Sequence, residues 1–124
     1  MIEIVLGANG RLSTEDIDKS EKVIAKSAIL GFQLESKVDV VDYGIRKAHS
    51  MGVKTLLDPA PATKLNEDLF SHIDYIKPNE TEATILTGIE VTDTASAEKA
   101  GRWFLDHGVN TAIITMGEKG ALMM

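Results

Sequence analysis

Short apolar segments rich in β-branched residues alternate along this chain with segments of helical spacing. The apolar segments cover residues 2–6, 28–34, 53–57, 73–76, 111–115 and, starting a last strand, 121–124. They lack the polar alternation of a half-exposed sheet, which is typical of strands buried on both faces. We therefore expect these segments to form the strands of a buried sheet.

The segments between the apolar runs carry helix signals. Ser13 has the position of an N-cap, and Leu12 and Ile17 then occupy the two positions of a hydrophobic staple. Apolar residues recur at offsets of 3, 4 and 3 from Val38 to Ala48, which predicts a second helix. Two more helices are expected after Asn79 and from Asp93 or Thr94, and glycines end the last three helices at Gly52, Gly88 and Gly108.

Strands that alternate with helices form βαβ units, whose crossovers give a parallel sheet. We predict an α/β fold with a parallel sheet flanked by helices on both faces, in one domain over residues 1–124. Because the sequence begins and ends inside predicted strands, we expect this domain to be truncated at both ends.

The composition excludes several classes of protein. The chain carries 13 Lys and Arg against 19 Asp and Glu, a formal charge of −6, which argues against a protein that holds nucleic acid phosphates. It contains no cysteine, so disulfides, thiolate metal sites and cysteine nucleophiles are ruled out. The N-terminal apolar run is too short for a signal peptide or a membrane span. We expect a soluble, cytoplasmic protein.

Polar residues follow four consecutive predicted strands: Glu35, Asp58, the segment 77–82 and the segment 115–120. In open α/β sheets, ligands bind outside the carboxyl ends of the strands. Each of these residues alone is ordinary loop chemistry, and Glu35 can either bind sugar hydroxyls or cap a helix that begins near Ser36. Together they predict a ligand site along one edge of the sheet.

The pattern Thr115-x-Gly117-x-x-Gly120 allows two interpretations. Glycines three residues apart let a loop adopt positive φ angles and bring its N–H groups close to phosphate oxygens. The alternative is a hairpin that joins residues 111–115 to residues 121–124. Spacing alone favours the hairpin, and the two are compatible because a hairpin turn can itself face a nucleotide.

Asn79 and Glu82 also allow two interpretations. Pro78 keeps Lys77 extended, which places Asn79 as an N-cap and Glu82 at the third helical position. This is the spacing of a capping box. The functional alternative is a carboxylate near a magnesium–phosphate complex, because Mg²⁺ takes one or two protein carboxylates and keeps several waters.

These motifs, in this order, resemble the ribokinase-like carbohydrate kinase family. The matching stretches are Gly7-Ala8-Asn9 with Leu12-Ser13, Gln33-Leu34-Glu35, Pro59-Ala60-Pro61-Ala62, Pro78-Asn79-Glu80-Thr81-Glu82-Ala83, Leu86-Thr87-Gly88 and Thr115-Met116-Gly117-Glu118-Lys119-Gly120-Ala121. Pro-Asn-Glu-Thr-Glu followed by Leu-Thr-Gly is the more specific signal, and the resemblance covers nearly the whole chain. It implies ATP-dependent phosphorylation of the primary (5-) hydroxyl of ribose.

The resemblance also implies roles for individual residues. Glu35 would bind sugar hydroxyls, Asn79 would contact the ATP phosphates, and Glu82 would organise Mg²⁺ through water. The ATP phosphates and ribose would be lined by Thr115, Met116, Gly117, Glu118, Lys119 and Gly120. A monovalent cation such as K⁺ belongs to the same implied chemistry, with ligands outside this chain. The implied partners are the sugar, ATP and further copies of the protein, with no nucleic acid or membrane.

The sequence departs from the family in three respects. Asp58 stands where Asn is expected before Pro-Ala-Pro, which adds a negative charge. The N-terminal sugar-binding part with its small β lid is absent, and so is the later Gly-Ala-Gly-Asp segment that supplies the catalytic base and anion hole. No catalytic residue is therefore assigned here, and we expect the chain alone to be inactive. The alternatives are a kinase for another sugar or nucleoside, a non-catalytic nucleotide-binding module, or a structural domain.

Overall fold

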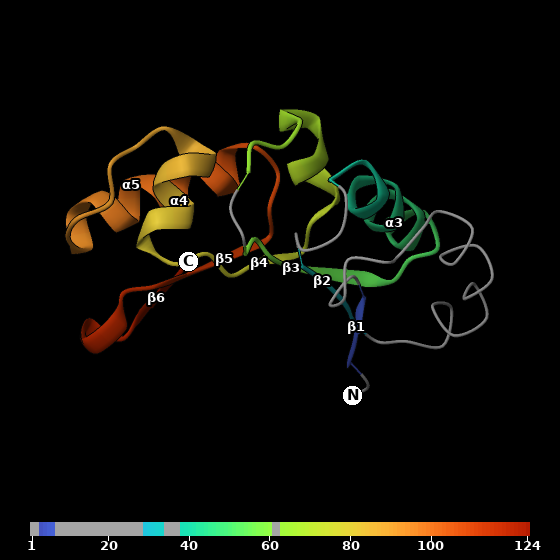
Figure 1. Cartoon of the computed structure of the whole chain (residues 1–124), viewed down its shortest axis with the longest axis horizontal. Helices are drawn as coiled ribbons and strands as arrows, with labels where there is room; N and C mark the ends of the chain where they lie inside the picture. The colour runs from blue at the N-terminus through green and yellow to red at the C-terminus, as the bar shows by residue number, and fades with distance from the viewer. Residues whose placement is uncertain (1–2, 7–28, 34–37, 61–62) are drawn as a thin grey trace.

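The computed structural model describes residues 3–6, 29–33, 38–60 and 63–124 (Figure 1). One six-stranded sheet contains, in chain order, β1 (Glu3–Leu6), β2 (Ile29–Gln33), β3 (Lys54–Asp58), β4 (Tyr75–Ile76), β5 (Thr111–Thr115) and β6 (Ala121–Met123). Strands β1 to β5 are parallel, and β6 runs antiparallel to β5. The predicted α/β fold with a parallel sheet is confirmed.

In the described residues, three α-helices and two 3₁₀ helices connect the strands: α3 (Val38–Ser50), η1 (Glu67–His72), α4 (Glu80–Thr87), α5 (Thr94–Asp106) and η2 (Gly117–Lys119). Figure 1 shows α3, η1, α4 and α5 on the same side of the sheet. A strand order that never reverses explains this, because right-handed crossovers that advance in one direction stay on one face. Helices were predicted on both faces, and the described residues place none on the second face. The helix expected from Ser13 lies outside the described residues.

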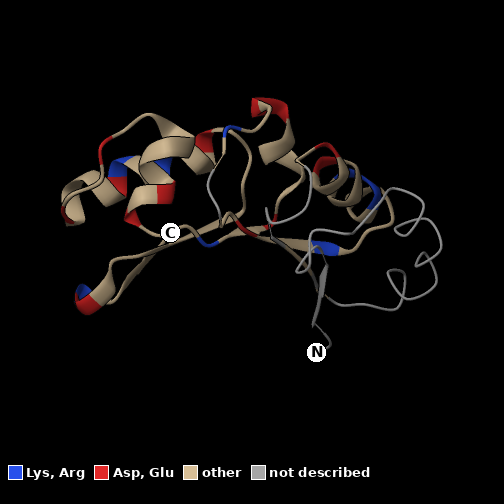
Figure 2. Ribbon diagram, viewed as in Figure 1, with Lys and Arg blue, Asp and Glu red and all other residues tan. Residues whose placement is uncertain are grey.

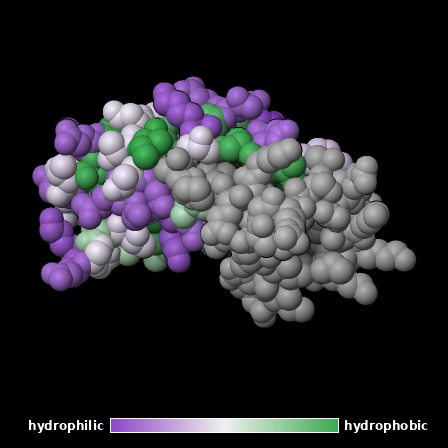
Figure 3. Space-filling view, in the orientation of Figure 1, coloured by the Kyte–Doolittle hydropathy of each residue, from purple (hydrophilic) through white to green (hydrophobic). Residues whose placement is uncertain are grey.

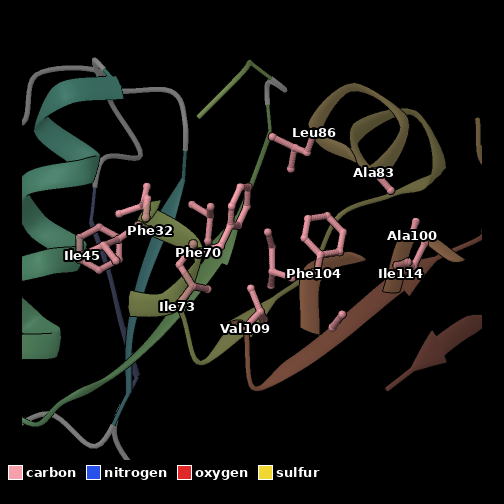
Figure 4. Close-up of a cluster of buried hydrophobic side chains, with 14 of the residues drawn as sticks. Phe32, Ile45, Phe70, Ile73, Ala83, Leu86, Ala100, Phe104, Val109 and Ile114 are labelled. Atoms are coloured by element: carbon pink, nitrogen blue, oxygen red, sulfur yellow. The ribbon is translucent and has the colours of Figure 1, made fainter. Parts of the chain in front are cut away.

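The main hydrophobic core lies between the sheet and these helices (Figure 4). Alternate strand residues reach it: Leu57 of β3, Ile76 of β4 and Ile114 of β5 are each 0% exposed. Their neighbours Leu56 and Ile113 point to the other face and are only half-buried. The prediction that the strands are buried on both faces is therefore wrong for β3 and β5, whose burial alternates.

An aromatic cluster joins η1 to α5 on the covered face. The Phe70 ring meets Trp103 and Phe104 at centroid separations of 5.2 and 5.8 Å. Gly108 follows α5 at φ +105°, and a Cβ there would lie 2.7 Å from the Cα of Ser71. Only glycine therefore fits this approach of the α5–β5 turn to η1.

A side-chain network fixes the amino ends of β3, β4 and β5 relative to one another. Asp74 Oδ2 accepts from the Thr55 N–H at 2.8 Å, and Asp74 Oδ1 accepts from Asn110 Nδ2 at 3.2 Å. The buried Thr55 hydroxyl donates to the His72 carbonyl at 2.7 Å. The register set here determines which residues emerge together at the carboxyl edge.

Polar groups cover much of the described surface in the view of Figure 3, where apolar side chains form small separate areas. Among the described residues, no helix is long and apolar enough to cross a bilayer.

Candidate functional site

The carboxyl ends of β4 and β5 bring two predicted site segments side by side. Asn79 and Thr115 form an isolated parallel bridge just beyond the two strands. The Thr115 N–H donates to the Pro78 carbonyl at 2.9 Å, which holds the two strand exits together. Residues 36 positions apart in the sequence are thus neighbours at this edge of the sheet.

Asn79 begins α4 as its N-cap with extended backbone angles. Its Oδ1 accepts from the Glu82 N–H at 2.7 Å, and its own N–H donates to Glu82 Oε1 at 2.8 Å. The predicted capping box is confirmed in both directions. This box also fixes both side chains in place, and it leaves Asn79 Nδ2 and Glu82 Oε2 without a bond to any described residue.

The loop from Thr115 to Gly120 is the turn of the β5–β6 hairpin, so the hairpin interpretation is confirmed. The Met116 N–H donates to the Gly120 carbonyl at 2.7 Å and closes the loop. Gly117 has φ +57° and Gly120 has φ +88° with ψ −137°, and a Cβ at either would meet nothing within 4 Å. Backbone conformation rather than crowding therefore requires glycine at both positions.

Several hydrogen-bond donors at this edge have no acceptor among the described residues. They include the N–H groups of Gly117 and Glu118, and the N–H groups of Glu80 and Thr81 in the first turn of α4. Helix N-termini and glycine loops with free N–H groups bind anions. Met116 contributes only main chain to such a surface, because its side chain is 6% exposed and lies in the core.

Charged residues of both signs surround the hairpin turn. Figure 2 shows an acidic and a basic residue together at its tip, where Glu118 and Lys119 stand. Lys119 also acts on Asp93, the N-cap of α5. The Ser96 N–H donates to Asp93 Oδ1 at 2.8 Å and is the main reason that the pKa of Asp93 lies below its ordinary value, with smaller contributions from the Ser96 hydroxyl, Lys119 and Lys99. The spacing of the motifs gave no sign that α5 begins next to this loop.

The remaining predicted residues lie elsewhere. Glu35 is outside the described residues, and Asp58 ends β3 with a half-buried side chain. Two surface pockets, of about 460 and 230 Å³, lie at α5 beside Lys99 and at the amino edge beside His49, away from Asn79. Neither pocket includes Asn79, Glu82 or the hairpin turn.

The family model described as pfkB family carbohydrate kinase matches residues 1–124. Ribokinase of Haemophilus influenzae is 47% identical over 122 residues, which are 98% of this chain and 40% of that protein. Deoxyribokinase of Salmonella typhi is 41% identical over 124 residues, 99% of this chain and 40% of that protein. The chain thus spans about 40% of the length of the curated relatives it matches.

Solved structures share the fold. Arabidopsis thaliana ribokinase, complexed with ribose and ATP, superposes with a TM-score of 0.78 at 22% identity, over 97% of this chain and 38% of that one. Phosphofructokinase-2 of Escherichia coli, in complex with fructose-6-phosphate, superposes with a TM-score of 0.69 at 19% identity, over 91% of this chain and 40% of that one. The resemblance inferred from the motifs is confirmed.

Proposed function

Since the chain belongs to the pfkB carbohydrate kinase family, we propose that it is the central segment of a kinase that transfers the γ-phosphoryl group of ATP to the 5-hydroxyl of ribose. The observation that carries this proposal is the bridge between Asn79 and Thr115, which merges the start of α4 with the glycine turn. A ribokinase is 47% identical to this chain, which favours ribose as the acceptor.

The groups at this edge fit the phosphates of a magnesium nucleotide. Asn79 Nδ2 and the free N–H groups of Gly117 and Glu118 would donate to phosphate oxygens. Glu82 Oε2 would accept from a water of the metal, since its other oxygen is held by the Asn79 N–H. When bound, magnesium ATP supplies the phosphoryl group and the metal spreads its charge. This segment's own task is to position and orient the nucleotide.

Glu35 is proposed as a ligand of sugar hydroxyls, on the sequence resemblance alone. A monovalent cation such as K⁺, self-association and a cytoplasmic location are part of the same proposal. Proton removal from the acceptor hydroxyl is assigned to the segments of the longer protein that these 124 residues do not contain.

A second acceptor is 2-deoxyribose, because a deoxyribokinase is 41% identical over the whole chain. The test uses the full-length kinase, meaning the encoded protein that contains these residues, or H. influenzae ribokinase with its matching segment replaced by them. Turnover with magnesium ATP is measured on ribose, 2-deoxyribose, other pentoses and nucleosides. The highest kcat/KM on ribose is expected. A higher kcat/KM on 2-deoxyribose or on a nucleoside would make that compound the acceptor in place of ribose. Nucleotide binding without turnover on any acceptor would contradict the proposed kinase function.

A further inference from the structure

We draw no further inference here: the strongest candidate, the side-chain cluster of His49 from α3 and His72 from η1 at the amino edge of the sheet, brings two imidazole rings to a centroid separation of 4.8 Å beside a cavity of about 230 Å³, but the described residues supply no third side chain to complete a metal site and nothing in the structure points to a ligand there.

Discussion

Asn79 and Glu82 hold each other through two reciprocal hydrogen bonds, of 2.7 and 2.8 Å, at the first turn of α4. The same pair is the centre of the proposed nucleotide site. A substitution that removes either side chain would therefore not distinguish loss of the helix cap from loss of a ligand contact. Variants that keep the cap can separate the two effects.

Asn79→Asp is the first such variant. Aspartate caps a helix about as well as asparagine, so the free energy of unfolding should stay within about 0.5 kcal/mol. The side chain would lose its Nδ2 donor and gain a negative charge facing the phosphates, so the KM for magnesium ATP should rise about tenfold or more. Steady-state kinetics and urea unfolding of the full-length kinase measure both. Asp93→Asn, the reverse exchange at the cap of α5, is the control and should leave the KM unchanged.

Glu82→Gln tests the metal role. Glutamine also closes a capping box, so stability should be preserved. Loss of the charge should raise the Mg²⁺ concentration for half-maximal rate roughly tenfold, as for other residues that act on a metal through its bound ligands. The KM for ribose should not change. A Mg²⁺ titration identical to that of the wild type would limit Glu82 to capping. Glu80→Gln, in the same helical turn, is the matched control.

Gly120→Ala tests the shape of the hairpin turn. The backbone angles of Gly120 are accessible almost only to glycine, so the variant should lose about 1–3 kcal/mol of stability although the added methyl meets no atom. The KM for magnesium ATP should rise as well. Gly52→Ala, at φ +76° beyond α3 and also with open space around it, controls for strain alone. If both variants lose the same stability and both keep the wild-type KM for magnesium ATP, the turn does not contact the nucleotide.

Asp93 should make the free energy of unfolding fall at acid pH. Its pKa is lowered in the folded chain, chiefly by the Ser96 N–H, so folding favours the ionised carboxylate. That stabilisation is complete above the pKa of the unfolded state, about 4, and is lost as pH falls through the folded pKa. In the Asp93→Asn variant, the asparagine caps α5 without titrating. The wild type should therefore lose stability relative to this variant between about pH 5 and pH 2, as measured by urea unfolding. If the difference in free energy of unfolding between the two proteins stayed constant across this range, the lowered pKa of Asp93 would be contradicted.

The 124-residue chain alone should release no ADP in a sugar-dependent manner. The resemblance assigns general base catalysis, worth about 10²–10⁴ in rate, to a segment that this sequence lacks. Half-buried Leu56 and Ile113, with Met123 at 69% exposure, leave apolar area on the second face of the sheet. We expect self-association in light scattering after gel filtration. Sugar-dependent turnover at rates typical of kinases would direct the search for a base to Glu35, Asp58 and Glu82.

The elements that sequence predicted well are those whose signal is local. The spacing of Asn79 and Glu82 predicted where α4 begins, and Gly88, which has a left-handed backbone conformation, predicted where it ends. The 3₁₀ helix η1 was not predicted, because its two buried residues, Leu69 and Phe70, are adjacent and show no helical period. The location of the helices on one face depends on strand order and crossover handedness, which no local pattern contains.

The candidate site was predictable to the extent that it follows strand ends. Which ends become neighbours depends on the sheet, and the bridge between Asn79 and Thr115 became visible only there. The nearness of Lys119 to Asp93 is likewise tertiary, since the two residues are 26 positions apart.

The uninterrupted order of β1 to β6 has a consequence for how the protein is made. Each strand pairs only with strands next to it in the sequence, so the ribosome delivers every new strand to an edge that is already in place. None of the described strands has to be inserted between two others, so each pairing joins neighbours in the sequence. We expect this sheet to assemble during translation, one βα unit at a time from the N-terminus. The carboxyl end of β2 would then be in place before the ends of β4 and β5, where the proposed nucleotide residues lie.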